Sequence, residues 1–268
     1  LGEVVRLSEA QGAEAPLSVG ATAKADGRDA GHRATLSNGD TAALGLHVDD
    51  LTRFALPLNA GPHFLIAGAA RSGKSTLLRT WAHSLANGVG NGGSSALRLF
   101  VLDSRRQSLG SLRSLPHVAG YSSEPAAAEK LLTQIEEELG QLVGGAAAGA
   151  ALVVMADDFG DNYDDGLGDN GRERLAALMR LGRDRPFHVL VAGRTSDLSS
   201  KSYLDPVKSL KEAQVGFMLG SGDDMMFNTR LPYTERSKLL PAGEGYYINR
   251  TYVRRVKLAV LDAELQGE

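Results

Sequence analysis

A glycine-rich segment between residues 61 and 78 carries residue types that can bind phosphate. It contains the pattern Gly-x-x-x-x-Gly-Lys-Ser, with Gly68, Gly73, Lys74 and Ser75 at the fixed positions. Glycines there let the backbone N–H groups wrap a phosphate without clashes from Cβ atoms. In such a loop the lysine reaches the β- and γ-phosphates, and the serine hydroxyl binds Mg²⁺. We therefore expect a site for ATP and Mg²⁺ in which Lys74 is catalytic and Ser75 is a metal ligand.

The segments on either side of this pattern suit a nucleotide-binding loop. The apolar run from Phe64 to Ala67 predicts a buried strand, and apolar side chains at helical spacing follow the loop. A strand, a loop and a helix in this order direct backbone N–H groups and the positive end of the helix at one anion. A glycine turn before an ordinary helix is the alternative. We expect the whole loop to bind the nucleotide: Gly68, Ala69, Ala70, Arg71, Ser72, Gly73, Lys74, Ser75 and Thr76.

Two carboxylates follow a second apolar strand, which runs from Leu152 to Ala156. A strand that delivers a carboxylate beside a phosphate-binding loop is the Walker B pattern, in which the acid holds Mg²⁺. We expect Asp157 to be this metal ligand; acids that merely end a strand are the alternative. The predicted strand 97–102 lies between the two motifs, an order typical of the RecA-like (ASCE) branch of P-loop NTPases.

The residue after the Mg²⁺-binding acid is usually glutamate in that branch, where it polarises the attacking water. Asp158 takes this position here, and its side chain is one methylene shorter. Catalysis is sensitive to displacements of about 1 Å. We therefore expect Asp158 to be the catalytic carboxylate of an ATPase with slow or conditional hydrolysis.

The predicted strand from Phe187 to Gly193 ends in Arg194 and Thr195. In the RecA-like architecture its end lies between the two motifs, where a polar residue can sense the γ-phosphate. We expect Thr195, or else Arg194, to contact the nucleotide; a loop that merely begins with polar residues is equally compatible. An arginine finger would come from a neighbouring domain or subunit, and we assign no arginine of this chain to that role.

The composition excludes several classes of site. The chain has 268 residues, a formal net charge of −3 and no cysteine. The missing cysteines exclude disulfides, thiol catalysis and cysteine-based zinc sites. The acidic balance argues against a generally basic nucleic-acid surface. Positive charge is dense only near the last predicted strands, and there we favour a solvated strand face over a nucleic-acid contact: Arg250, Arg254, Arg255 and Lys257.

The hydrophobic pattern divides the chain into two parts. We expect residues 1–43 to be a linker or N-terminal edge strands, and residues 44–262 to form the P-loop ATPase domain. Apolar strands alternate with amphipathic helices in the second part, which predicts an α/β fold with a central, mostly parallel sheet and helices on both faces. Residues 103–122 read as a polar connecting segment. The chain begins with Leu1 rather than Met, which we interpret as a fragment of a longer protein.

Four parts of the sequence resemble the FtsK/SpoIIIE ATPases, and within that family the tandem ATPase domains of type VII secretion coupling proteins (EssC/EccC). The segment from Gly61 to Ser75 is similar to the phosphate loop of the family, and residues 44–48 and 55–58 are similar to the lead-in strands of the type VII domains. The Asp157-Asp158 pair is similar to the degenerate Walker B motif of their later domains. The stretch from Pro241 to Tyr247 resembles their closing glycine turn and strand. The likeness covers roughly residues 43–262.

The resemblance implies a cytoplasmic domain, from the C-terminal part, of a membrane-anchored secretion motor. Its partners would be neighbouring ATPase domains, other copies in a hexameric ring, and secreted WXG100-type proteins whose C-terminal signal docks by apolar contacts. Nucleic acid is not an expected partner, and a membrane would be contacted only by parts outside this chain. Apolar residues at 225–227 and 231–233 could dock such a signal, but core packing is the favoured interpretation.

The resulting hypothesis is a Mg·ATP-binding domain of a type VII protein secretion ATPase, with weak or regulated hydrolysis, that serves substrate recognition and translocation. One alternative is an FtsK-like DNA translocase motor, against which the acidic balance and the lack of a basic winged-helix segment count. Another is a non-hydrolysing substrate-docking module, against which the intact Lys74-Ser75 pair counts. A metabolic kinase would need a second-substrate signature, and none is visible.

Overall fold

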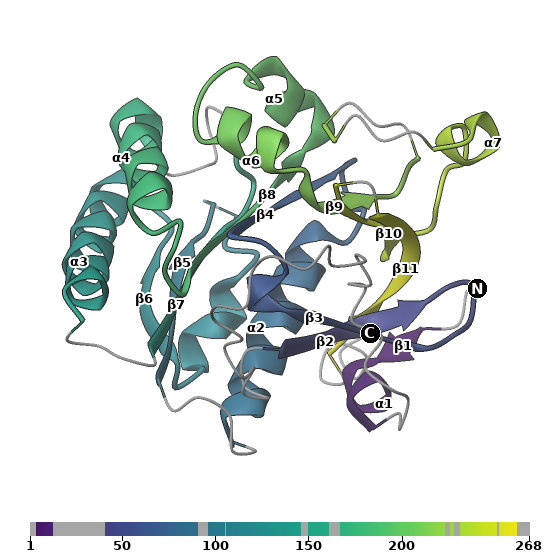
Figure 1. Ribbon diagram of the computed structural model, residues 1–268, viewed down its shortest axis with the longest axis horizontal. Helices are drawn as coiled ribbons and strands as arrows, with labels where there is room; N and C mark the ends of the chain where they lie inside the picture. The colour runs from purple at the N-terminus through teal and green to yellow at the C-terminus, as the bar shows by residue number, and fades with distance from the viewer. Residues whose placement is uncertain are drawn as a thin grey trace, which may run out of the picture.

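Strands and helices alternate through most of the chain and assemble around one mixed sheet (Figure 1). The computed structural model describes residues 4–12, 41–90, 96–104, 106–145, 150–160, 167–222, 226–227, 231–250 and 252–261. The strand order is β3-β2-β11-β10-β9-β4-β8-β7-β5-β6, and β1 pairs with β11. The predicted α/β fold with a mostly parallel sheet is thereby confirmed.

The half of the sheet that carries the two motifs is parallel. Its strands, in spatial order, are β9 (Val215–Leu219), β4 (His63–Gly68), β8 (Phe187–Arg194), β7 (Ala150–Ala156), β5 (Ala96–Leu102) and β6 (Val118–Ser122). β8 lies between β4 and β7, as the RecA-like arrangement requires. Because the carboxyl ends of parallel strands meet at one edge of a sheet, the loops after β4, β8, β7 and β5 converge there.

The other half of the sheet is antiparallel and contains β10 (Glu244–Asn249), β11 (Tyr252–Val260), β2 (Thr41–His47) and β3 (Arg53–Pro57). The short strand β1 (Val5–Arg6) runs parallel to β11, and α1 (Leu7–Gly12) follows it directly. Residues 5–10 therefore pack against the sheet, with Val5, Leu7 and Ala10 buried against Ala259. Most of the predicted linker, 1–43, lies outside the described residues.

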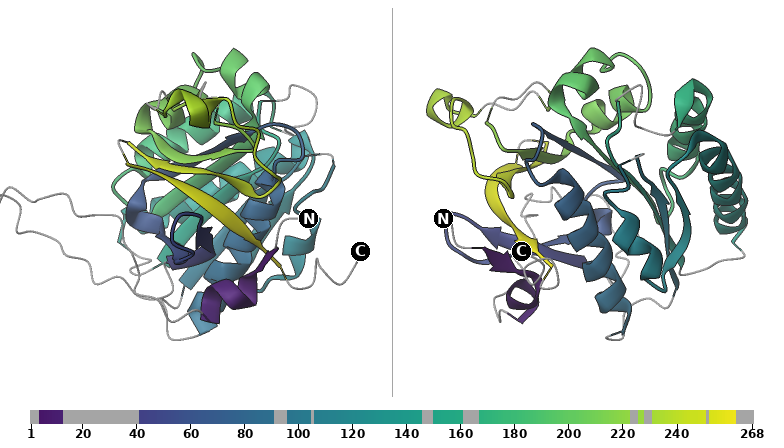
Figure 2. Two further views of the ribbon diagram at one scale, coloured as in Figure 1. Left: turned by 90° about the vertical axis from the view of Figure 1, so that its right-hand side faces the viewer. Right: turned by 180° about the vertical axis from the view of Figure 1, so that it is seen from behind.

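Helices cover both faces of the sheet (Figure 2). On one face lies α2 (Lys74–Gly90), which runs through residues 87–90, beyond the apolar pattern. On the other lie α3 (Pro125–Val143), α4 (Gly168–Leu181), α5 (Thr195–Ser200) and α6 (Val207–Ala213). α7 (Tyr233–Arg236) and the 3-10 turns Leu58–Ala60 and Gly110–Ser114 complete the described elements.

Side chains of β4 alternate between two buried cores, which is why this strand is apolar throughout. Phe64 and Ile66 pack with Trp81 of α2 on one face. Leu65 and Ala67 belong to the core of the opposite face, with the helices α3 to α6. The two cores fix the position of the residues that follow Gly68.

One predicted connecting segment differs in the structure. Residues 103–122 contain a 3-10 turn and the edge strand β6, rather than irregular chain alone. The strand has five residues, most of them partly exposed, and includes Gly120. A Cβ at Gly120 would lie 2.2 Å from Leu131 Cδ1 of α3. The strand therefore forms because α3 packs against it, a contact that its own hydrophobic pattern does not encode.

Gly216→Ala tests the close approach of β9 to β4. Gly216 has a φ of +156°, and a Cβ there would lie 1.8 Å from the carbonyl oxygen of Leu65. We expect the substitution to lower the free energy of unfolding by about 3 kcal/mol or more in urea titrations. Gly140→Ala is the matched control, because Gly140 is an exposed helical glycine with open space around it. It should raise the stability by up to about 1 kcal/mol, and equal effects of the two changes would contradict the account.

Candidate nucleotide-binding site

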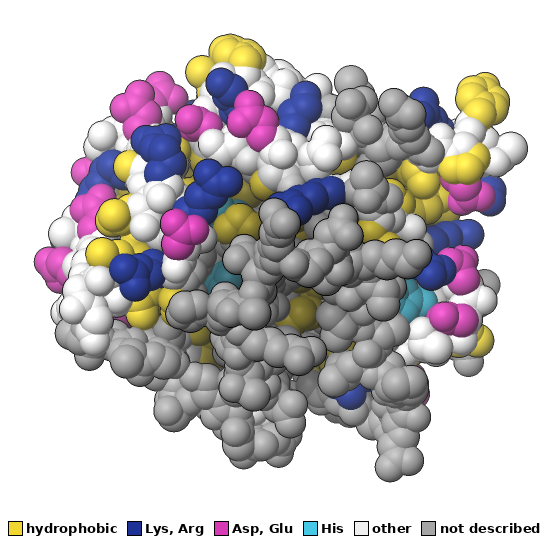
Figure 3. Space-filling view, viewed as in Figure 1, with side chains coloured by type: hydrophobic (Ala, Val, Ile, Leu, Met, Phe, Trp, Pro, Cys, Tyr) yellow, Lys and Arg dark blue, Asp and Glu magenta, His cyan; other side chains and the backbone are white. Residues whose placement is uncertain are grey.

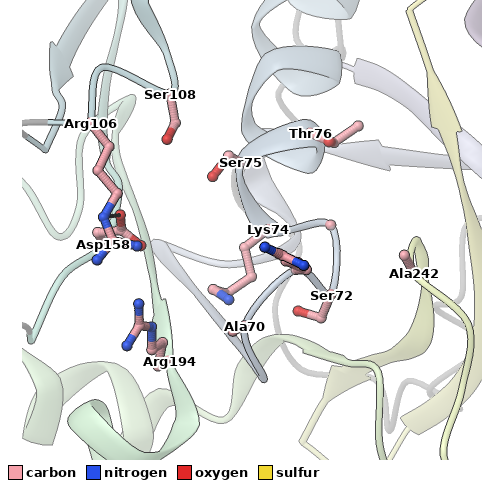
Figure 4. A pocket seen from close by; sticks show the side chains of 12 residues that line it. Ala70, Ser72, Lys74, Ser75, Thr76, Arg106, Ser108, Asp158, Arg194 and Ala242 are labelled. Carbon is pink, nitrogen blue, oxygen red and sulfur yellow. Dashed lines mark ion pairs between the residues drawn. The ribbon is translucent and has the colours of Figure 1, made fainter. Parts of the chain in front are cut away.

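A cavity of about 730 Å³ opens at the carboxyl edge of the parallel strands (Figure 4). The phosphate-binding loop forms one wall, and the segments after β5, β7 and β8 form the opposite wall. The lining residues are Ala70, Arg71, Ser72, Gly73, Lys74, Ser75, Thr76, Arg106, Ser108, Asp158, Arg194 and Ala242. The structure thus brings the predicted loop together with Asp158, and it adds Arg106, Ser108 and Ala242, which the sequence did not single out.

Close contacts on two sides hold the phosphate-binding loop. A Cβ at Gly68 would lie 2.5 Å from Ser72 Oγ and 2.7 Å from the carbonyl oxygen of Leu219 in β9. Gly73 has a φ of +100°, and the Gly243 N–H donates to the Ser72 carbonyl at 3.0 Å. The glycine turn before β10 is therefore part of the loop's support, which explains why Ala242 lines the cavity.

Lys74 turns back onto its own loop. Its Nζ donates to the carbonyl oxygens of Ala69 at 2.7 Å and Gly68 at 3.2 Å. Burial lowers the pKa of Lys74, and the charges of Asp157 and Asp158 oppose that effect. The present acceptors are neutral carbonyls, whereas phosphate oxygens are negatively charged and would bind the ammonium more strongly. The Lys74 ammonium can therefore exchange these two carbonyl oxygens for the oxygens of a bound phosphate.

Ser75 and Asp157 meet across the site. Ser75 Oγ donates to Asp157 Oδ2 at 2.6 Å. The other carboxylate oxygen, Oδ1, is buried and has no hydrogen-bond partner among the described residues. Burial raises the pKa of Asp157 to about 6, and the charge of Asp158 adds to the rise, while the Ser75 hydrogen bond and the nearby backbone N–H of Asp158 oppose it.

A buried carboxylate oxygen without a partner carries a desolvation cost that a cation would relieve. Mg²⁺ in nucleotide sites is held by one or two carboxylates together with phosphate oxygens and waters. One hydroxyl, one buried carboxylate and a neighbouring phosphate-binding loop meet that requirement. The residues present therefore fit Mg²⁺ bound with a nucleotide phosphate.

Asp158 faces the cavity from a left-handed backbone conformation, with a φ of +49°. Ser104 Oγ donates to its Oδ2 at 3.3 Å, and Arg106 Nε lies 4.0 Å from the same oxygen. Both partners come from the segment after β5. No sequence motif marks that segment, but the convergence of loops at this edge of a parallel sheet could have suggested it.

The segment after β5 is organised by Asp103. The buried carboxylate of this residue accepts hydrogen bonds from the N–H groups of Ser104 and Leu109, both at 2.8 Å, and from the Tyr121 hydroxyl at 2.6 Å. Burial raises the pKa of Asp103, although these three donors oppose the rise. Asp103 is thus satisfied within the fold and serves to position its neighbours.

Of the two candidates at the end of β8, the structure brings Arg194 to the cavity. Arg194 ends the strand and lines the cavity wall opposite the phosphate-binding loop (Figure 4). Thr195 begins α5 and is not among the described residues that line the cavity. Contact between Thr195 and a nucleotide stays a prediction.

Two of the four basic residues near β11 pair with acids. Arg255 pairs with Glu244 at 2.8 Å, and Arg254 lies 3.5 Å from Asp49. On the face shown in Figure 3, basic and acidic side chains are interspersed among the described residues. This pairing agrees with a solvated strand face.

The apolar residues considered for signal docking fall into two groups. Met226 and Phe227 are buried in one of the two cores, as favoured from the sequence. Tyr233 is 83% exposed on α7. Met225 lies outside the described residues. Within the described ranges, no helix combines the length and the apolar character needed to cross a membrane.

Sequence comparison connects these residues to known proteins. Residues 41–143 match the model of the FtsK/SpoIIIE family. The chain is 26% identical over 228 residues to the ESX secretion system protein EccC of Thermomonospora curvata, an alignment that covers 80% of this chain and 16% of that protein.

The solved structures that resemble this chain include ATPase domains of EccC and of EssC. The EccC ATPases 2 and 3 of Thermomonospora curvata, in complex with a signal sequence peptide, match with a TM-score of 0.68 and 26% identity over 84% of this chain and 41% of theirs. EssC ATPases 2 and 3 from Geobacillus thermodenitrificans match with a TM-score of 0.72 over 98% of this chain and 45% of theirs. Their 16% identity supports the fold alone. The chain spans less than half the length of each of these relatives.

Asp157→Asn tests the buried carboxylate through the pH dependence of stability. The pKa of Asp157 is raised from 3.8 to about 6 in the folded protein, so folding favours the protonated acid and the wild type loses this stability as pH rises through about 6. Asparagine does not titrate. The free energy of unfolding of the variant relative to the wild type should therefore rise by about 1 kcal/mol between pH 5 and pH 8.

Urea unfolding at a series of pH values measures this difference. Asp169→Asn is the control, because Asp169 is an exposed acid at the start of α4. A relative stability of Asp157→Asn that does not change with pH would show that the carboxylate is not held in a desolvated site.

Proposed function

We propose that this chain, whose residues 41–143 match the FtsK/SpoIIIE family model and which is similar to EccC and EssC ATPases, is the Mg·ATP-binding domain of a type VII secretion ATPase. We further propose that it hydrolyses ATP slowly or only under regulation. The observation that supports the nucleotide site most strongly is the unpaired, buried Oδ1 of Asp157 beside Ser75 and the phosphate-binding loop. The fold alone would not require that arrangement.

Each residue of the site has a separate part in binding. Lys74 exchanges the carbonyls of Gly68 and Ala69 for phosphate oxygens, and the N–H groups of the loop and the start of α2 bind the same phosphates. Ser75 Oγ and Asp157, which lie next to each other, would hold the metal. When bound, Mg²⁺ neutralises phosphate charge and polarises the transferred phosphoryl group.

Two features of Asp158 support slow hydrolysis. Its carboxylate is one methylene shorter than the usual glutamate, so it stands farther from a water positioned by the loop. It also accepts a hydrogen bond from Ser104 Oγ, which competes with a water for the same oxygen. Because proton abstraction requires hydrogen-bond distance, both features lower the turnover rate.

The proposed partners follow from the relatives. EccC and EssC structures contain consecutive ATPase domains, and one EccC structure is a complex with a signal sequence peptide. We accordingly propose neighbouring ATPase domains of the same protein as partners, assembly into a hexameric ring, and secreted WXG100-type proteins as substrates. The domain would lie on the cytoplasmic side of a membrane-anchored protein.

A non-hydrolysing docking module is the second candidate. It is favoured by the internal contacts of the site, since Lys74 and Ser75 are hydrogen-bonded within the protein. In such a module the nucleotide, if bound at all, would stabilise the fold rather than supply energy. The two experiments below separate the candidates.

Calorimetric titration with ATP and Mg²⁺ tests the nucleotide site directly. The wild type should bind in the micromolar range, and Lys74→Ala should bind at least about 100-fold more weakly because several charge-assisted hydrogen bonds are lost. Lys208→Ala, at an exposed position of α6, removes the same charge away from the cavity and should leave binding unchanged. Equal binding by the wild type and Lys74→Ala would refute the site.

Asp158→Glu tests the cause of the expected slow turnover. Restoring the missing methylene should raise the rate of phosphate release by about 10-fold or more, and Asp158→Asn should abolish it. Phosphate-release assays at saturating ATP measure both. Fast turnover by the wild type that disappears in Asp158→Asn would show that hydrolysis is neither weak nor regulated through this residue.

A further inference from the structure

Arg106 is a cation of the cavity wall that neither sequence motif includes. Its side chain is 51% exposed and extends from the segment after β5 toward Asp158 (Figure 4). The wall that carries it faces the phosphate-binding loop with Lys74 (Figure 4). A long cation in this position lies within a nucleotide-sized cavity.

The backbone of Arg106 is held by hydrogen bonds of its own and of the residues around it. Its N–H donates to Ser104 Oγ at 3.3 Å, and the same hydroxyl donates to Asp158 Oδ2. Asp103 holds the N–H groups of Ser104 and Leu109 on either side of it. The cation is therefore attached to a rigid base rather than to a free loop.

The same segment is also tied to the start of α2. Arg79 donates to the Ser108 carbonyl at 2.6 Å and to Thr76 Oγ1 at 3.2 Å. Thr76 belongs to the phosphate-binding loop motif. The position of the Arg106 backbone relative to the loop is thus set by hydrogen bonds on both sides of the cavity.

The ion pair between Arg106 and Asp158 is weak enough to be exchanged. Its N–O distance is 4.0 Å and the Arg106 side chain is half exposed. Pairs of this kind contribute little to stability, whereas a guanidinium binds phosphate oxygens through two parallel hydrogen bonds. Asp158 occupies the position of the carboxylate that faces the terminal phosphate in related sites, so Arg106 lies on the side of the cavity that distinguishes ATP from ADP.

We propose that Arg106 binds the terminal phosphate of ATP from within the same chain, and that its ion pair with Asp158 competes with this contact. Arg106 then contributes to the affinity for ATP but not to that for ADP. When the Arg106 side chain moves from Asp158 to the phosphate, the Asp158 carboxylate also becomes free to accept a hydrogen bond from water. This role rests on the nucleotide site proposed above. In that site, Arg106 would be the residue that gives a preference for ATP over ADP.

Binding of ADP and of a non-hydrolysable ATP analogue, both with Mg²⁺, tests the proposal by calorimetry. Arg106→Ala should weaken binding of the ATP analogue by about 10-fold and change ADP binding by less than about 2-fold. Arg106→Lys, which keeps the charge, should recover part of the loss. Arg98→Ala is the control, because Arg98 lies on β5, pairs with Glu138 of α3 and is not among the described residues that line the cavity.

A double-mutant cycle tests the competition with Asp158. In an Asp158→Asn background, the Asp158 carboxylate no longer competes with the phosphate for Arg106, so Arg106→Ala should cost more ATP-analogue affinity than in the wild type, by a further factor of about 3. Equal losses in the two backgrounds would overturn the exchange. Equal weakening of ADP and the ATP analogue would overturn contact with the terminal phosphate.

The outcomes also separate this proposal from the one on which it rests. If the wild type binds neither nucleotide, the proposed nucleotide site itself is wrong. If the wild type binds both and Lys74→Ala binds neither, while Arg106→Ala behaves as the wild type, the site stands and the role of Arg106 is wrong. Thermal unfolding of each variant shows whether it is folded, and Arg106→Gln replaces Arg106→Ala if that variant is not.

Discussion

The hydrogen bond between Ser75 Oγ and Asp157 Oδ2 is the contact on which the rest of the site depends. It joins the start of α2 to the end of β7, although β8 separates β4 from β7 in the sheet. A bond of 2.6 Å across a whole strand requires that all three strands keep their register. The two cores, one on each face of the sheet, provide that constraint. The site is thereby rigid before any ligand binds, which reduces the cost of binding.

The same contact leaves the site incompletely satisfied. Asp157 uses one carboxylate oxygen, while the other is buried without a partner. Lys74, in contrast, is satisfied by the carbonyls of its own loop. A site that a ligand completes in this way costs stability in the free protein and recovers it on binding. The arrangement accounts for the raised pKa of Asp157 and for the ease with which Lys74 and Ser75 can change partners.

The parts of this site that the sequence predicts are those encoded locally. Gly68 to Thr76 lie on one strand-to-helix connection, and Asp157 follows a strand whose apolar character is visible in a few residues. The position of β8 between β4 and β7 could be predicted because a strand lies between the two motifs in the sequence, which is typical of the RecA-like arrangement. The fold class was predictable because each strand of the parallel half is buried on both faces and therefore reads as a continuous apolar run.

The parts that the sequence does not predict depend on contacts between distant segments. Strand β6 is held by α3, and the support of the loop by Gly243 joins residues 72 and 243. Arg106 reaches the cavity because Asp103, Tyr121 and Arg79 fix its segment. At the end of β8, Arg194 and Thr195 are adjacent in the sequence, but only Arg194 lines the cavity. Thr195 begins α5, so the strand ends at Arg194. Hydrophobic periodicity cannot resolve such details.

The central claim is that Asp157 and Ser75 complete a metal site only together with a nucleotide phosphate. Pulsed electron paramagnetic resonance of the domain with Mn²⁺ in place of Mg²⁺ tests it most directly, through the coupling between the metal and neighbouring phosphorus nuclei. The account predicts tight Mn²⁺ binding with ATP, clear phosphorus coupling, and loss of the bound signal in a Ser75→Ala, Asp157→Asn double variant. A spectrum with ATP that is identical for the wild type and the double variant would contradict it.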